Sequence, residues 1–354
     1  MTEDGNITEE KKNMKDSCWQ QGNTEAAQHY FDHVSRFTEL HAYDLIQALY
    51  PQIIKAKTIL DIGCGPGTFA LAYVRTFPKG ILGQTLICSD LSPGMVQCAK
   101  NIMKERLPSK YATKFQFQVE DGSELNAVAD DSIDVVVSVF GIFIIPDYMQ
   151  TLEAIRRVLR QPSSDESDHN RHGGIFGTAV WTMTDHRRAL KSEGFGPSFH
   201  ELIEESLQEL TTLSDKPDIE GNDGNTADDG NSTTKNNSMT LPPWKRWFDP
   251  ERCRQMVVVD ANYQASSYQV IRSYHSTIFQ SPAALWDMIA TNPMSKVKDA
   301  APDRIAKVQV NLQNEFLTSS LDNNNDKSSE TERETHTGPV IVGTASNLVL
   351  ARPC

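Results

Sequence analysis

Three glycines at alternating positions stand in the segment DIGCGPG, where an apolar run ends and a helical pattern begins. Asp61 opens the segment, and Gly63, Gly65 and Gly67 allow the backbone to turn sharply and to approach a bound molecule closely. A strand that runs into glycines and then into a helix directs backbone N–H groups and the positive end of the helix dipole at one spot. The segment therefore predicts a ligand-binding turn.

The neighbouring residues narrow the class of ligand. A nucleoside-triphosphate loop needs Gly-Lys-Ser/Thr, whereas Gly67 is followed by Thr68 and Phe69. A dinucleotide fingerprint reads GxGxxG, whereas this segment reads GxGxG, and the carboxylate of Asp61 would repel a pyrophosphate. The same carboxylate suits a ligand that carries positive charge, such as an amino group or a sulfonium.

Two further acidic residues follow the next expected strands. Asp90 ends the run TLICSD, where a carboxylate can accept hydrogen bonds from two ribose hydroxyls. Asp121 lies in VEDGSEL beside Gly122, and this pair can read the exocyclic amine and a ring nitrogen of adenine. A single aspartate at a strand end is more typical of a turn or a cap. Three successive strand ends that each carry a suitable group favour one shared ligand site.

These residues need a sheet to bring them together. From Lys57 onward, short apolar runs alternate with amphipathic patterns, which is typical of βα units and a mostly parallel sheet. Residues 132–140 are apolar almost throughout, as in a central strand buried on both faces. Ser92 and Pro93 predict the start of a helix. We expect strands at residues 57–63, 85–90, 114–120, 132–140, 174–182, 266–274 and 347–352, and helices at 92–107, 151–159 and 249–263.

The motifs ILDIGCGPGTFA, ICSDLSPGMV, VEDGSEL and DVVVSVFGIFIIPD follow one another in this order. They resemble the class I S-adenosylmethionine-dependent methyltransferases, in particular the small-molecule branch typified by the ubiquinone/menaquinone-biosynthesis enzymes. The resemblance is specific over about residues 28–181 and looser beyond. It implies a Rossmann-like α/β fold: a seven-stranded, mostly parallel sheet with the last strand antiparallel, helices on both faces, and a helical lid insertion. It also implies S-adenosyl-L-methionine as the cofactor.

The resemblance also assigns roles to residues. The glycine loop would flank the methionine part of the cofactor, with Asp61 near its amino end and Asp90 at the ribose. Phe140, after the fourth strand, would border the sulfonium and the substrate, and Tyr30 would close over the cofactor's carboxylate. The tight turn usual before strand five is replaced here by residues 161–174, which leaves the substrate assignments open. The residues assigned to the cofactor are Tyr30, Asp61, Gly63, Cys64, Gly65, Gly67, Asp90, Leu91, Met95, Asp121, Gly122 and Phe140.

Methyl transfer from a sulfonium is an in-line displacement, so the main task of the protein is to position and desolvate the reactants. Holding the two reacting atoms about 3–3.5 Å apart contributes on the order of 7–11 kcal/mol. A general base adds roughly 10²–10⁴-fold where the nucleophile must lose a proton. His186, just past the fifth strand, is the leading candidate base. His200, Tyr274 and His275 are further candidates, and each is also typical of a surface or lid residue.

The nature of the acceptor is indicated only by aromatic residues. Trp244, Trp247 and Trp286, with Phe195 and Phe199, would cover an apolar or aromatic small molecule from a lid. The alternative is that they pack the lid on the core. Two other functions stay open: methylation of a protein or RNA residue, and a cofactor-binding scaffold that catalyses a rearrangement instead of methyl transfer.

Composition limits the partners. The net charge of −13, without a basic block, argues against nucleic acid or an anionic membrane as the main partner. Six cysteines without a CxxC motif favour reduced thiols in the cytoplasm and no metal site. No apolar stretch approaches the roughly 18 residues of a membrane span. We therefore expect a cytoplasmic enzyme that acts on a small-molecule acceptor.

Three stretches rich in Asn, Asp, Ser and Thr interrupt the pattern and cannot bury enough apolar surface to offset the entropy of ordering. They predict mobile insertions in one large domain. The expected organisation is a flexible tail at 1–27 and a single methyltransferase domain at 28–354, with a lid at 185–248, a mobile insertion at 215–238, and mobile loops at 161–174 and 322–338.

Overall fold

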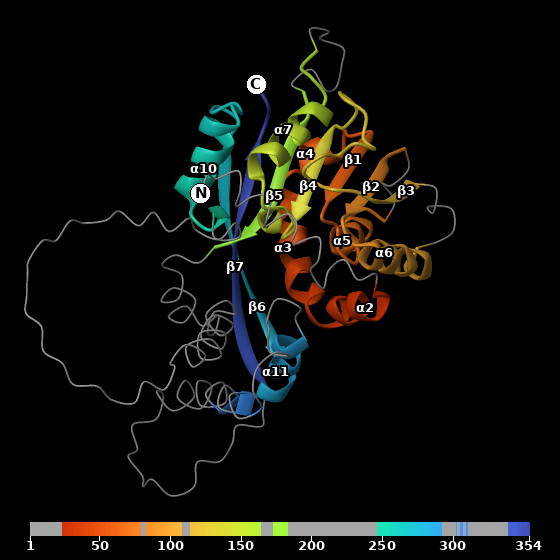
Figure 1. Cartoon of the computed structure of the whole chain (residues 1–354), viewed down its shortest axis with the longest axis vertical. Helices are drawn as coiled ribbons and strands as arrows, with labels where there is room; N and C mark the ends of the chain where they lie inside the picture. The colour runs from red at the N-terminus through yellow and green to blue at the C-terminus, as the bar shows by residue number, and fades with distance from the viewer. Residues whose placement is uncertain are drawn as a thin grey trace, which may run out of the picture.

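The fold was analysed in a computed structural model, which describes most of the chain. The described residues are 23–78, 83–107, 114–163, 173–182, 246–291 and 339–354, with isolated positions between 302 and 310. Within them, seven strands form one sheet in the order β3-β2-β1-β4-β5-β7-β6 (Figure 1). The strands are β1 (Thr58–Ile62), β2 (Thr85–Asp90), β3 (Phe115–Val119), β4 (Val135–Val139), β5 (Ile175–Trp181), β6 (Gln269–Phe279) and β7 (Val340–Ala351).

The first five strands pair in parallel, and β7 inserts antiparallel between β5 and β6. This arrangement confirms the predicted Rossmann-like sheet with an antiparallel last strand. Every residue of β5 is buried, and four of the five residues of β4 are buried, as expected for strands in the middle of a sheet covered on both faces.

Helices surround this sheet. Their starts follow local rules: Ser92 caps α6 by accepting a hydrogen bond from the Met95 N–H, with Pro93 in the first turn, and Asp249 caps α10 in the same way. The segment after α10 is a π-helix, Gln255–Asp260, and the chain leaves it through Asn262 with a φ of 54°. The helices are α2 (Thr24–His33), α3 (Ser35–Ala48), α4 (Tyr50–Ile53), α5 (Thr68–Thr76), α6 (Pro93–Arg106), α7 (Tyr148–Val158), α10 (Pro250–Arg254) and α11 (Pro282–Thr291).

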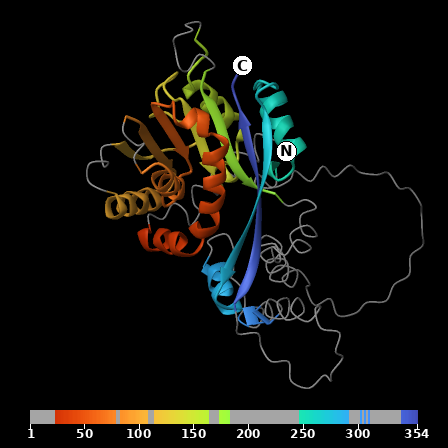
Figure 2. The ribbon, with the colours of Figure 1, turned by 180° about the vertical axis from the view of Figure 1, so that it is seen from behind.

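Strands β6 and β7 are longer than the sequence predicts. The register of β5 covers only Ser346–Ala351 of β7, so the rest of β7 pairs with β6 alone as a two-stranded ribbon. Figures 1 and 2 show this ribbon running away from the parallel strands toward α11. A second hydrophobic cluster, separate from the main core, forms there between the ribbon, α11 and the α2–α3 region, with Phe37 and Phe279 in contact at its centre.

Two expectations change at the edges of the described segments. Helix α2 begins at Thr24 and buries Ala27, so this helix includes residues that the sequence analysis placed in a tail at 1–27. Trp247 is fully buried in the main core and Trp286 is buried in the second cluster, which favours core packing for both. These two side chains are therefore not free lid aromatics, because each one fills a core where its apolar surface is removed from water.

Candidate active site

The glycine loop lies where the strand order changes direction, because β1 pairs with β2 on one side and with β4 on the other. The loops that follow β1 and β4 touch each other. A Cβ on Gly63 would lie 2.9 Å from the Cα of Gly141, and one on Gly141 would lie 2.8 Å from the carbonyl oxygen of Ile62. Only glycine fits at this contact. Ligands of open α/β sheets bind at such a switch point.

The three glycines of the loop have different surroundings. All have positive φ, at 64° for Gly63, 52° for Gly65 and 90° for Gly67. A Cβ on Gly67 would lie 3.2 Å from the Cβ of Ala99 in α6, whereas one on Gly65 would meet no atom within 4 Å. Gly63 and Gly67 therefore serve packing within the protein. Gly65 leaves open space where a side chain would otherwise project.

Asp90, at the end of β2, reaches across to this loop. Its Oδ2 accepts a hydrogen bond of 2.8 Å from the N–H of Gly65, and its Oδ1 accepts one of 2.9 Å from the N–H of Ser92. Burial raises the pKa of this carboxyl group, and the two N–H donors counteract the rise. Burial and the nearby Asp90 carboxylate also raise the pKa of Tyr30 on α2, so the phenol keeps its proton.

Asp61 is the least satisfied polar side chain of the site. It is 1% exposed, and neither carboxylate oxygen has a hydrogen-bond partner among the described residues. Burial, and secondarily the charge of Asp90, raise its pKa well above the usual range. An isolated buried carboxylate is costly unless a cation or donors reach it. The chemistry of the position therefore calls for a positively charged hydrogen-bond donor.

Several assigned residues are held by interactions within the protein. Asp121 accepts hydrogen bonds through Oδ1 from the N–H and the hydroxyl of Ser123, at 2.9 and 2.7 Å, and so caps its own turn. A Cβ on Gly122 would lie 2.7 Å from Ile62 and 2.8 Å from Ile145. Its glycine therefore serves packing.

The remaining residues predicted to bind the cofactor lie around the start of α6 and in the glycine loop. Met95 is buried and Leu91 is half-buried. Cys64 is buried, its thiol donates to the Gly65 carbonyl, and a hydrogen bond with Cys88 together with burial raises its pKa. The Cys64 thiol is therefore protonated and not a nucleophile.

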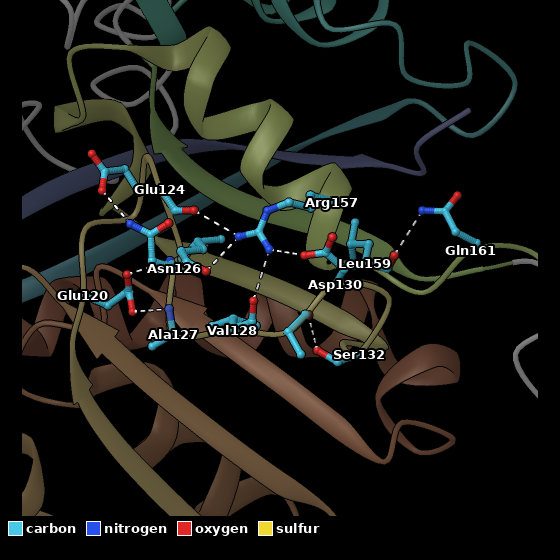
Figure 3. A network of polar contacts seen from close by, with 12 residues as sticks. Glu120, Glu124, Asn126, Ala127, Val128, Asp130, Ser132, Arg157, Leu159 and Gln161 are labelled. Carbon is cyan, nitrogen blue, oxygen red and sulfur yellow. Dashed lines mark hydrogen bonds and ion pairs between the residues drawn. The ribbon is translucent and has the colours of Figure 1, made fainter.

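Arg157 of α7 holds the loop that carries Asp121, a role the sequence did not suggest (Figure 3). Its guanidinium donates to the carbonyls of Glu124, Leu125 and Val128, at 3.0, 2.8 and 3.2 Å, and also pairs with Asp130. Leu125 has a positive φ of 51°, so the loop takes a conformation that needs support. The guanidinium provides it by binding three carbonyls from one side.

Aromatic side chains lie at the carboxyl ends of β4 and β5. Phe140, directly after β4, has a φ of 55°, and its ring stacks on Trp181 at the end of β5 with centroids 3.8 Å apart. A bulky residue with positive φ is strained and is found where the surroundings fix it. The imidazole of His41 meets both rings edge-on, at 5.3 and 5.8 Å. These three rings form a wall next to the Gly63–Gly141 contact.

Next to this wall lies a polar network, of which the sequence analysis named only His275. His41 is fully buried on α3, with Nδ1 2.7 Å from Ser273 Oγ and Nε2 3.1 Å from Thr344 Oγ1. Ser273 donates to Asp44, and Nε2 of His275 lies 2.7 Å from the same carboxylate oxygen. The available signal was the spacing of His41 and Asp44 on one helix face and of Ser273 and His275 on one strand face.

The ligand atoms of His41, Asp44 and His275 lie within 4.8 Å of one another, close enough to share a metal ion. The Ser273 hydroxyl, however, stands between His41 and Asp44 and bonds to both. The arrangement is therefore complete as a hydrogen-bonded chain. Of the candidate bases, His275 and Tyr274 lie on β6. His186 and His200 lie outside the described residues, as do Trp244, Phe195, Phe199 and most of the segments predicted as insertions and lid.

Part of the chain matches a known protein family and a few curated proteins. Residues 59–162 match the family described as "Methyltransferase domain". Uncharacterized proteins of Mycobacterium tuberculosis and Mycobacterium bovis are 26% identical over 149 residues, which is 40% of this chain and 46% of theirs. The matched segment thus spans less than half the length of these curated relatives.

Solved structures with a similar chain path include the YcgJ protein of Bacillus subtilis, with 16% identity, a TM-score of 0.46, and coverage of 88% of this chain and 98% of that one. A putative methyltransferase of Bacillus halodurans has 11% identity, a TM-score of 0.45, and coverage of 85% and 94%. Among the described residues, no helix has both the length and the apolar character needed to cross a membrane. Residues 59–162, which hold the glycine loop and the strand ends around it, thus match the methyltransferase domain family.

Proposed function

We propose that this chain transfers the methyl group of S-adenosylmethionine to a small organic acceptor. The observation that carries the proposal is Asp61: a buried carboxylate that has no hydrogen-bond partner among the described residues, beside a loop that leaves open space at Gly65. A cationic amino group at this position would satisfy the carboxylate, and no phosphate would. Asp90 adds carboxylate lone pairs beyond the two backbone bonds, which suits ribose hydroxyls.

The residues would divide the work as follows. Asp61 and the loop around Gly65 would hold the methionine end, Asp90 the ribose, and Leu91, Met95 and the Asp121–Gly122 turn the adenine. The bound cofactor supplies an activated methyl group on a sulfonium. The protein would orient the acceptor toward it and exclude water, because in-line alignment is worth on the order of 7–11 kcal/mol.

The aromatic wall supports an apolar or aromatic acceptor. Phe140, Trp181 and His41 present ring surfaces beside the contact between the two glycine loops. Free cysteines, four of the five described ones buried, support a reducing, cytoplasmic setting. We also propose that the described segments from Thr24 onward belong to one domain, because α3 contributes to both hydrophobic clusters.

Calorimetry and thermal unfolding with S-adenosylmethionine, S-adenosylhomocysteine and NADH test the cofactor. The first two ligands should bind, and a ligand at 100 times its Kd should raise the free energy of unfolding by about 2.7 kcal/mol. Binding of NADH alone would contradict the proposal.

Incubation with methyl-labelled S-adenosylmethionine and cell extract, followed by mass spectrometry, tests the transfer. The label should appear in a small molecule. Label in protein or RNA would instead support the alternative acceptors, and cofactor consumption without label transfer would support a rearrangement.

A further inference from the structure

The hydrogen bonds of the polar network next to the aromatic wall determine which ring nitrogen of His41 carries a proton. Ser273 donates its hydroxyl proton to Asp44, so its oxygen is an acceptor for the N–H at Nδ1 of His41. Nε2 of His41 then accepts from the hydroxyl of Thr344. The buried imidazole is thereby fixed in one tautomer, with its Nδ1 shared between Ser273, which leads on to Asp44, and Ser346 at 2.9 Å.

Asp44 receives hydrogen bonds from both sides. Hydrogen bonds from His275 and Ser273 lower the pKa of Asp44 against the opposing effect of burial, so the carboxylate is ionised. An ionised carboxylate only accepts hydrogen bonds, which requires that Nε2 of His275 carries a proton. The other nitrogen, Nδ1, makes no hydrogen bond to a described residue, and the His275 side chain is 25% exposed. Among the described residues, Nδ1 of His275 is thus a ring nitrogen without a hydrogen-bond partner, placed to accept a proton from a bound molecule.

The position of His275 relates it to the proposed acceptor site. His275 pairs with Thr344 on β7, two residues along from the pair between Ser346 and Trp181, the last residue of β5. It therefore lies just past the carboxyl edge of the sheet. Its ring is 4.8 Å from that of His41, which in turn contacts Phe140 and Trp181.

We propose that His275 is the general base of the transfer, that Asp44 is its positioning residue, and that the acceptor nucleophile is a hydroxyl on an aromatic ring. This inference rests on the proposed methyl transfer. The hydroxyl proton moves to Nδ1 of His275, and the acceptor oxygen forms the new bond to the methyl carbon. The carbon–sulfur bond breaks in the same step, and its electron pair stays on sulfur. A carboxylate that holds the second imidazole nitrogen fixes the tautomer for such a role.

The first test needs neither cofactor nor acceptor. Protein labelled with ¹⁵N-histidine is measured by NMR at neutral to alkaline pH, with signals assigned through His275→Gln and His41→Gln. His275 should be protonated at Nε2 and bare at Nδ1, and Asp44→Asn should give a mixture of tautomers. A proton on Nδ1 of His275, or no effect of Asp44→Asn, overturns the proposal.

The second test measures the rate of methyl transfer to the extract acceptor as a function of pH. His275→Gln should lower the rate by roughly 10²–10⁴-fold and remove the acid limb of the profile, with unchanged binding of S-adenosylmethionine. Arg272→Gln, an exposed neighbour on β6, serves as the matched control. Full activity in His275→Gln would contradict the assignment of His275 as the base. If the unaltered protein does not bind the cofactor, the proposed function is wrong, and the NMR measurement still decides the tautomer of His275.

Discussion

Asp61 holds an ionisable group in a buried place where no donor among the described residues bonds to it. Because its folded pKa is raised, the folded chain keeps a proton that the unfolded chain releases above about pH 3.9. The free energy of unfolding should therefore fall as pH rises from there to the folded pKa of Asp61, and this contribution should be constant above it. Each unit of pKa displacement corresponds to about 1.4 kcal/mol.

Asp61→Asn should consequently make the cofactor-free protein more stable at neutral pH and remove that decline. The same change should weaken binding of S-adenosylmethionine by about 1.5–3 kcal/mol, because a hydrogen bond between charged groups is lost. Urea denaturation across pH and calorimetry measure the two effects. Asp134→Asn is the matched control: this buried aspartate already bonds Lys57, Thr58 and Arg160, so its replacement should destabilise the fold. Lower stability in Asp61→Asn would contradict the expectation.

Gly65 and Gly63 make a second matched pair. Alanine at either position suffers the strain of positive φ, about 1–2 kcal/mol. Only at Gly63 does the new Cβ also collide with the backbone of Gly141. Gly63→Ala should therefore be the less stable variant, whereas Gly65→Ala should fold and lose cofactor binding. Thermal unfolding with and without S-adenosylmethionine separates them, and normal binding by Gly65→Ala would place the ligand elsewhere.

At the scale of elements, α7 acts on the loop after β3 through one side chain. Arg157→Ala leaves three carbonyls and Asp130 without their donor, and since the guanidinium is 36% exposed we expect only about 1 kcal/mol of destabilisation. The larger effect should be faster hydrogen exchange in residues 121–131 and weaker binding of the adenosine part. Arg156→Ala, which loses a contact to Ala261 instead, is the control. Equal exchange rates in both variants would deny Arg157 this role.

The bounds of several strands and helices could be predicted from the sequence because their signals are local. Strand β2 has the predicted bounds, and the caps at Ser92 and Asp249 lie where predicted. The far halves of β6 and β7 were missed, since exposed residues alternate along β6 beyond residue 274. His41 and Ser273 are 232 positions apart, so no local pattern announces their contact. The strain at Phe140 is likewise a product of tertiary packing with Trp181.

At the scale of the whole molecule, α3 joins two hydrophobic clusters. Phe37 packs on Phe279 in the second cluster, while Leu45 and Ile46 belong to the main core. Phe37→Ala should lower the free energy of unfolding by about 3–5 kcal/mol and leave a single transition. Trp286 lies in the second cluster and Trp247 in the main core, so tryptophan fluorescence senses both. Urea unfolding curves measured by fluorescence and by circular dichroism should coincide, because α3 couples the two clusters. Two separate transitions would show that the clusters unfold independently.

The residues proposed for the cofactor and those proposed for the acceptor come from different parts of the sheet, which affects how the substrate preference of the protein can evolve. Asp61 and Asp90 lie near the carboxyl ends of β1 and β2, and Asp121 follows β3. The three rings and the His275–Asp44 pair come instead from α3, β5, β6 and the residue after β4. Under the proposed function, substitutions at His41, Trp181 and the outer half of β6 should redirect substrate preference while the affinity for S-adenosylmethionine is preserved. Libraries for directed evolution should concentrate on these positions, where new acceptors can be gained without rebuilding the donor site.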